Sequence, residues 1–235
     1  MAKTDIIFIL DKSGSMHGLE DDTIGGFNAF IDKQKALSDE AHVTTILFDN
    51  NAVVLHDRSD LKAVQPLTRK EYFTGNSTAL LDAVGNAVHD FKHRQESGDG
   101  NFDAEKVIFI ITTDGHENSS HEYSYGSVKA LIEERKSKGW EFIFLGANID
   151  AGEVAGRMGV SASRAKNFHN DSQGVSVNFA TVSKAVESYR SSSADEDLDD
   201  DWGEDIDDDF AEREKKSNPL ADKIRNGIKG LGFRK

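Results

Sequence analysis

Two short runs of apolar residues place the strongest constraint on how this chain can fold. Asp5–Leu10 reads Asp-Ile-Ile-Phe-Ile-Leu, and Lys106–Thr113 reads Lys-Val-Ile-Phe-Ile-Ile-Thr-Thr. Neither run alternates between apolar and polar residues, so each predicts a strand that is buried on both faces. Strands of this kind occur in parallel sheets that helices cover on both sides.

Segments with helical spacing of apolar residues lie between these and further strands. Because strands joined by helices indicate a mostly parallel sheet, we expect a doubly wound α/β domain over residues 1–190. The turn Asp49–Asn51 predicts a hairpin, which places one antiparallel strand at the edge of the sheet. The further strands are predicted at Val43–Phe48, Ala52–His56, Trp140–Leu145 and Ala165–Phe168, and the helices at Thr23–Leu37, Ala79–Arg94, Tyr125–Lys138, Glu153–Met158 and Val175–Arg190.

The composition changes abruptly after Arg190. Residues 193–212 contain 12 Asp and Glu and no Lys or Arg, so we expect a disordered acidic linker over residues 191–212. Residues 213–235 are basic, and their apolar positions predict an amphipathic helix that can pair with the acidic run. The linker also contains spaced apolar residues, so it can dock on a basic partner or on its own domain, where one of its carboxylates could block a metal site. These apolar residues are Leu198, Trp202, Ile206 and Phe210.

Composition and charge exclude several classes of protein. The chain has no cysteine, which excludes disulfides, thiolate metal sites and thiol nucleophiles. A net charge of -14 repels phosphates, so we expect no nucleic-acid partner. No apolar run approaches the roughly 20 residues of a membrane-spanning helix, and we expect no stable membrane association. Residues 1–4 lack the features of a secretory signal, so we expect a cytoplasmic protein.

Three polar loops lie next to the predicted strands and helices. We expect them to meet at one edge of the sheet. Asp11, Ser13 and Ser15 follow the first strand, Thr78 precedes a helix, and Asp114 follows the strand Lys106–Thr113. In open α/β sheets, ligands bind beyond the carboxyl ends of the strands. Carboxylate and hydroxyl oxygens suit Mg²⁺, and the same set suits Mn²⁺. Because hydroxyl ligands are neutral, they leave the ion electron-poor and attractive to a carboxylate from outside.

The same residues resemble the metal-ion-dependent adhesion site of von Willebrand factor type A domains. The D-x-S-x-S of Asp11, Ser13 and Ser15 resembles the first element of that site, Thr78 its second-loop threonine, and Asp114 its third-loop aspartate. The resemblance covers roughly residues 4–190, and Gly146-Ala147-Asn148 is similar to prokaryotic members, so a prokaryotic or phage protein is expected.

The resemblance implies a role for each residue. Ser13, Ser15 and Thr78 would bind the metal through their hydroxyls, and Thr78 would switch between direct and water-mediated contact. Asp11 and Asp114 would act through water or as hydrogen-bond acceptors behind the ligands. An Asp or Glu side chain of a partner protein would complete the coordination. The predicted function is therefore Mg²⁺-dependent protein binding, as a non-enzymatic adaptor or assembly factor.

Two other functions stay open. A metal-dependent phosphatase would use Asp11 as its nucleophile, although haloacid-dehalogenase-like enzymes need a second aspartate where this chain has Ser13. The chain contains neither the phosphate-binding G-x-x-x-x-G-K-[ST] loop nor the hydrolase G-x-S-x-G turn. The second alternative is a protein that acts through its acidic tail, as a docking motif or a nucleic-acid mimic. His116 and His121 lie close to Asp114 in the sequence and could border the metal site.

Overall fold

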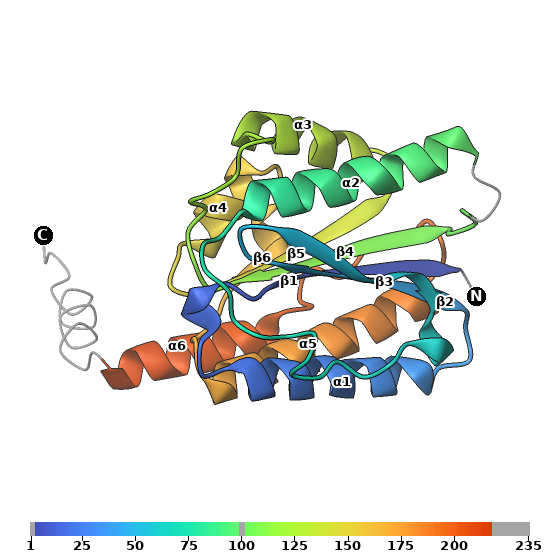
Figure 1. Ribbon diagram of the computed structural model, residues 1–235. Coiled ribbons are helices and arrows are strands. Elements are labelled where there is room, and N and C mark those ends of the chain that lie inside the picture. Colours follow the sequence, from blue (N-terminus) through green and yellow to red (C-terminus); the bar gives the residue numbers. More distant parts are fainter. Residues whose placement is uncertain (1–2, 99–101, 218–235) are drawn as a thin grey trace, which may run out of the picture.

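A six-stranded sheet forms the centre of the molecule in the computed structural model, which describes residues 3–98 and 102–217 (Figure 1). The strand order is β3-β2-β1-β4-β5-β6. Only β3 runs antiparallel to its neighbour. The predicted mostly parallel sheet with one antiparallel edge strand is therefore confirmed. The strands are β1 Thr4–Asp11, β2 Ala41–Phe48, β3 Ala52–Asp60, β4 Lys106–Thr113, β5 Trp140–Gly146 and β6 Ala165–Asn167.

Helices cover both faces of this sheet. In Figure 1, α2, α3 and α4 lie above it, and α1, α5 and α6 lie below it. Within the two described ranges, no helix has the length and apolar character that crossing a membrane requires. The helices are α1 Glu20–Lys35, α2 Leu80–Ser97, α3 Tyr125–Lys136, α4 Ala151–Arg157, α5 Ser172–Ser191 and α6 Glu204–Ser217, and three 3₁₀ turns lie at Gly14–Met16, Leu61–Ala63 and Ala162–Arg164.

Three helices begin earlier than the apolar spacing predicts, among them α5, which starts at Ser172 rather than Val175 because the Asp171 side chain caps it. Helix α1 starts at Glu20 rather than Thr23, because Glu20, Asp21 and Asp22 place negative charge at the positive end of the helix dipole. Helix α4 starts at Ala151 rather than Glu153, because the Asp150 side chain accepts a hydrogen bond from the Glu153 backbone N–H and so caps the helix. Polar residues that start helices carry no apolar periodicity, so the spacing alone missed them.

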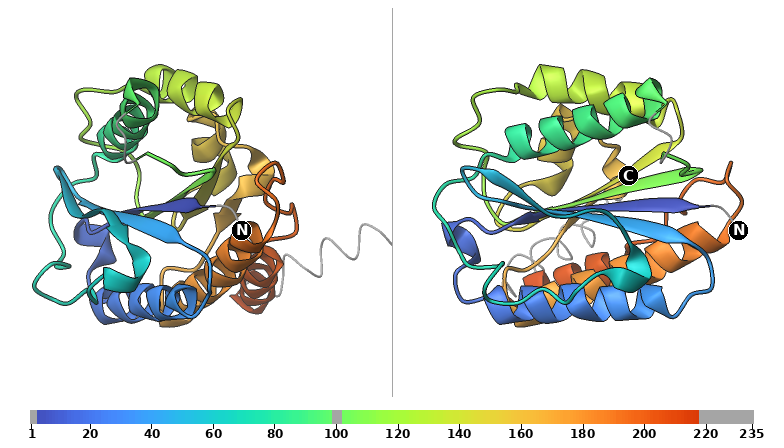
Figure 2. Two further views of the ribbon diagram at one scale, coloured as in Figure 1. Left: turned by 90° about the vertical axis from the view of Figure 1, so that its right-hand side faces the viewer. Right: turned by 45° about the vertical axis from the view of Figure 1, so that its right-hand side comes forward.

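The central strand β1 contributes side chains to two separate cores. Ile6, Phe8 and Leu10 pack into the core on the α1 and α5 side, whereas Ile7 and Ile9 pack into the core on the α2 and α3 side. All eight residues of the strand are buried. The continuous apolar run is thus explained by burial on both faces, as predicted, and Figure 2 shows the two helical layers that enclose the sheet.

The acidic segment is ordered, and the expectation of a disordered linker over residues 191–212 is wrong. Leu198, Trp202 and Ile206 are all buried in the core on the α1 and α5 side. The Trp202 indole N–H donates to the Ser163 carbonyl at 2.9 Å. These apolar side chains recur every four residues and complete a core that the first 190 residues leave open. The segment therefore docks on its own domain.

Basic side chains of the domain offset the negative charge of this segment. Arg164 pairs with Asp200 at 2.7 Å, and Lys184 on α5 pairs with Asp205 at 2.7 Å. Lys106, buried at the start of β4, donates to the Ser192 hydroxyl at 2.6 Å. Charge density predicts disorder only when no cations face the acids, and here the fold supplies them. The predicted basic amphipathic helix falls largely on residues 218–235, which lie outside the described part of the chain.

We predict that the acidic segment contributes to the stability of the whole domain. The side chain of Ile206 is 1% exposed. The variant Ile206→Ala should lower the free energy of unfolding by about 2–5 kcal/mol, because it removes buried methyl groups and leaves a cavity. The matched variant Asp208→Ala, at an exposed position of α6, should stay within about 0.5 kcal/mol of the parent. Urea unfolding measures both. Equal stabilities of the parent and Ile206→Ala would contradict the packing described here.

Candidate metal centre

The predicted site lies between the two central strands, where the order of the strands changes direction. Strands β1 and β4 are parallel neighbours, with Leu10 opposite Thr112, and from them the strand order runs outward in both directions. Ligands of open α/β sheets bind at this switch point, beyond the carboxyl ends of the strands. Asp11 ends β1, and Asp114 follows β4. The topology thus brings the first and third predicted loops side by side.

The Asp11 carboxylate is buried and held at both oxygens. Oδ1 accepts a hydrogen bond from the Ser13 backbone N–H at 2.7 Å, and Oδ2 accepts one from the Thr113 hydroxyl at 2.6 Å. Burial raises the pKa of this carboxyl group above its usual value, and the bonds from Thr113 and Ser13 act in the opposite direction. Asp11 is therefore fixed in orientation at the base of the site.

The two serines connect the first loop to the third. Their hydroxyl oxygens, Ser13 Oγ and Ser15 Oγ, lie 3.1 Å apart, and Ser15 Oγ donates to Asp114 Oδ1 at 2.5 Å. Ser13 and Asp114 are each 1% exposed, whereas Ser15 is exposed. Burial raises the pKa of the Asp114 carboxyl group, and the bond from Ser15 lowers it. Three oxygens from two loops thus form a continuous row.

Thr78 joins this group from the second loop. Its backbone N–H donates to Asn118 Oδ1 at 2.9 Å, which ties it to the third loop. A Cβ atom placed on Gly115 would lie 3.4 Å from Ser15 Oγ and 3.6 Å from Thr78 Oγ1. The two hydroxyls therefore converge on the same side of Gly115, and a residue without a side chain leaves the space between them open.

Backbone contacts hold the first two loops together. The Gly14 N–H donates to the Asn76 carbonyl at 2.9 Å, and the Gly75 N–H donates to the Lys12 carbonyl at 2.6 Å. Lys12 also forms a buried ion pair with Asp49 at 3.0 Å. The hydroxyls are therefore presented by loops that are already ordered, which lowers the cost of bringing ligands to an ion.

The third loop is anchored on the start of α2. Glu117 Oε2 accepts from the Leu81 N–H at 2.9 Å, and Asp82 Oδ2 accepts from the His121 N–H at 2.8 Å. The His121 backbone therefore serves as an anchor. His116 is exposed and lines a hollow between the loops and α6, together with Asn148, Asn170 and Phe210.

Sequence reasoning missed two asparagines and a tyrosine that support the site. Asn170 Nδ2 donates to Asp114 Oδ2 at 2.8 Å, and Asn148 Nδ2 donates to the Asp114 carbonyl at 3.4 Å. The Tyr72 hydroxyl donates to the Asp11 carbonyl at 2.6 Å. Asn170 follows the last strand at the same sheet edge, so the rule that located Asp11 and Asp114 could have located it. No comparable signal marks Tyr72.

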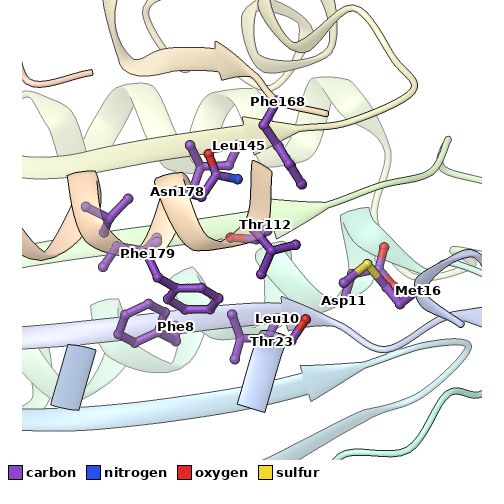
Figure 3. Close-up of a pocket in the computed structure, with 13 residues that line it drawn as sticks. Phe8, Leu10, Asp11, Met16, Thr23, Thr112, Leu145, Phe168, Asn178 and Phe179 are labelled. Carbon is purple, nitrogen blue, oxygen red and sulfur yellow. The ribbon is translucent and has the colours of Figure 1, made fainter. Parts of the chain in front are cut away.

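A narrow cavity of about 20 Å³ lies below Asp11, between β1 and α5. Figure 3 shows Asp11 and Met16 at one end of it, and Phe8 and Phe179 at the other. The side chain of Asn178 also lines the cavity, and among the described residues its amide has no hydrogen-bond partner. The cavity has room for about one water molecule. The floor of the site is therefore mostly apolar.

The donor set fits Mg²⁺ or Mn²⁺. Mg²⁺ binds oxygens at 2.0–2.1 Å in octahedral geometry, so neighbouring ligands lie about 2.9 Å apart. The separation of 3.1 Å between the two serine hydroxyls matches such an edge. No group of three or more His, Cys, Asp and Glu side chains suited to a metal occurs in the described ranges. Any ion held here would therefore be held mainly by hydroxyls, with Asp11 and Asp114 behind them.

Comparison with known proteins places the chain in a family. The sequence model described as "von Willebrand factor type A domain" matches residues 5–188. No curated protein sequence matches the chain.

Solved structures share the fold at low sequence identity. The chain is similar to the D319A mutant of the PilB minor pilin from Streptococcus sanguinis, with 12% identity, a TM-score of 0.58, and coverage of 82% of this chain and 64% of that one. It is also similar to proximal thread matrix protein 1 from the mussel byssus with a zinc-occupied MIDAS motif, with 14% identity, a TM-score of 0.54, and coverage of 77% and 47%. The chain thus spans less than two thirds of either protein. At these identities the likeness shows the fold alone.

We predict that Gly75→Ala will disturb the contact between the first two loops. The new Cβ would lie 1.9 Å from Asp49 Oδ2, so either the buried Lys12–Asp49 pair or the loop must move. The free energy of unfolding should fall by about 1–3 kcal/mol. As a control, Gly25→Ala lies within α1, where the new Cβ would meet nothing within 4 Å, and it should stabilise the protein by about 0.5–1 kcal/mol. Thermal melts compare the stabilities of the two variants. A Gly75→Ala protein as stable as the parent would show that the two loops can move apart without cost.

Proposed function

We propose that this chain, which belongs to the von Willebrand factor type A domain family, binds a partner protein through a Mg²⁺ ion that accepts an Asp or Glu side chain of that partner. The observation that carries the proposal is the convergence of Ser13, Ser15 and Thr78 beside two buried carboxylates at the sheet edge. Mn²⁺ is the alternative ion, because it accepts the same oxygen donors.

The roles of the residues follow from their contacts. Ser13, Ser15 and Thr78 would hold the ion through their hydroxyls. Asp11 and Asp114 already accept hydrogen bonds at both carboxylate oxygens, which supports a role behind these hydroxyls. When bound, the ion supplies a positive charge that attracts a carboxylate. The zinc-occupied MIDAS motif of the mussel protein, which shares this fold, also supports a metal at this place.

The arrangement favours binding over phosphoryl transfer. A phosphatase nucleophile needs a carboxylate oxygen that can reach the substrate. Asp11 is 1% exposed, and Thr113 and Ser13 occupy its two oxygens. We therefore propose that the protein is not an enzyme. A phosphatase would instead hydrolyse a generic phosphoester and lose that activity in Asp11→Asn.

The packing of the acidic segment weakens the alternative of a tail that acts by itself. Leu198, Trp202 and Ile206, which would anchor a free tail to a partner, are buried in this protein's own core. We propose that the metal centre is the main binding surface, in an adaptor or assembly factor. A prokaryotic or phage origin and a cytoplasmic location stay predictions from the sequence.

We predict that Mg²⁺ stabilises the protein and that the two serines are needed for this effect. Binding to the folded state alone raises the free energy of unfolding by about 2.7 kcal/mol at a Mg²⁺ concentration of 100 times Kd. The double variant Ser13→Ala with Ser15→Ala should lose most of this gain, because it removes two hydroxyl donors. Thermal melts over a Mg²⁺ titration provide the measurement.

A second serine pair controls for the loss of hydroxyls in general. Ser97 and Ser137 are exposed at helix ends and lie outside the site. Ser97→Ala with Ser137→Ala should respond to Mg²⁺ as the parent does. A parent protein whose melting temperature does not change in millimolar Mg²⁺ would refute the proposed metal centre.

We further predict that recognition depends on a carboxylate of the partner. Peptides selected for binding in Mg²⁺ should contain an Asp or Glu whose replacement by Asn or Gln weakens binding at least tenfold, because the amide carries no charge for the ion to attract. EDTA should have the same effect on the unchanged peptide. Calorimetry or fluorescence anisotropy measures the affinities. Selected peptides that bind equally well in EDTA would place recognition elsewhere on the protein.

A further inference from the structure

One four-residue loop contacts both the proposed metal centre and helix α6. Residues 168–171 lie between β6 and α5. Within this loop, Asn170 donates to Asp114 Oδ2 at 2.8 Å. The other oxygen, Asp114 Oδ1, accepts from Ser15. Asn170 therefore sets how the Asp114 carboxylate faces the hydroxyls.

Both neighbours of Asn170 are held by α6. The His169 ring stacks on Phe210, with ring centroids 4.6 Å apart and an interplanar angle of 21°. Asp171 forms an ion pair with Arg213, and Arg213 NH1 also donates to Asp171 Oδ1 at 3.1 Å. The two α6 contacts thus flank the residue that contacts Asp114.

The loop has little freedom to absorb a displacement. The Phe168 N–H donates to the Gly146 carbonyl at 3.0 Å, and the Asp171 N–H donates to the His169 carbonyl at 2.8 Å. Asp171 also caps α5 by accepting from the Gly174 N–H at 2.9 Å. A Cβ on Gly174 would lie 2.0 Å from the His169 oxygen, so helix and loop are in close contact. A shift of α6 would therefore be passed on to Asn170.

We propose that α6 is a positioning element of the metal centre, and that Phe210 and Arg213 act through Asn170 on the Asp114 carboxylate. The proposal rests on the proposed metal-binding function and adds a part of the chain to it. The family match ends at residue 188, whereas α6 begins at Glu204. The acidic C-terminal helix thus contributes to metal affinity although it supplies no ligand.

Full-length variants test this coupling. Asn170→Ala should weaken Mg²⁺ binding by about 10–100-fold, the usual effect of losing a group that orients a metal site. Arg213→Gln should weaken it by at least threefold, and Arg213→Lys should restore most of the affinity because it keeps the ion pair. Losing a positive charge would by itself strengthen cation binding, so a weaker site would indicate lost positioning.

Lys184→Gln is the matched control. It also removes one cation and one ion pair between α6 and the rest of the domain, that of Lys184 on α5 with Asp205 on α6 at 2.7 Å, but this pair does not involve the loop. Its Mg²⁺ affinity should stay within twofold of the parent. Equal losses in Arg213→Gln and Lys184→Gln would overturn the proposal, because general loosening of α6 would then explain both.

A second measurement does not depend on metal binding. The Asn170 side-chain amide gives an NMR signal that can be assigned from its absence in Asn170→Ala. In metal-free protein, Arg213→Gln and Phe210→Leu should shift or broaden this signal, and Lys184→Gln should not. An unchanged signal in Arg213→Gln would overturn the proposal. If the signal responds but the parent does not bind Mg²⁺, the positioning role stands and the proposed function fails.

Discussion

The burial of two carboxylates, Asp11 and Asp114, beyond adjacent parallel strands is the constraint that shapes the site. A buried charge is costly unless hydrogen bonds or an opposite charge compensate it. Here the compensation comes from the Ser13 N–H and the Thr113 hydroxyl at Asp11, and from Ser15 and Asn170 at Asp114. These bonds draw three loops into one place, and they leave the serine and threonine hydroxyls facing a common space. A divalent cation in that space would relieve the remaining cost of burying both charges.

The same constraint explains why elements far from the hydroxyls matter. Each carboxylate oxygen accepts a hydrogen bond, so the positions of the donors determine how the carboxylate is presented. For Asp114 Oδ2 that donor is Asn170, which lies in a loop between two contacts with α6. Helix α6 thereby contacts the loop that holds Asp114, through one ring contact and one ion pair.

The acidic segment shows where composition misleads. Its charge density is typical of a disordered linker, yet Leu198, Trp202 and Ile206 fall on the open side of the core. The cations that neutralise it, Arg164 and Lys184, are distant in the sequence. The spacing of these apolar residues indicated that the segment could dock on a partner or on its own domain. Local composition contains neither the gap in the core nor the position of these cations, so the segment alone could not show which of the two occurs.

From the sequence alone we could predict the strands, their mostly parallel arrangement and five candidate metal-site residues, whose binding of an ion stays a prediction. Continuous apolar runs require burial on both faces, and the carboxyl ends of parallel strands meet at one edge, so Asp11 and Asp114 had to lie close together. The hydrogen bond from Asn170 to Asp114 and the docking of the acidic segment became visible only in the folded chain. Parallel-strand topology places Asn170 at the same sheet edge, but which donor reaches Asp114 depends on the packing of the loop between β6 and α5. The docking depends on contacts such as that of Trp202 with Ser163, which lie 39 positions apart.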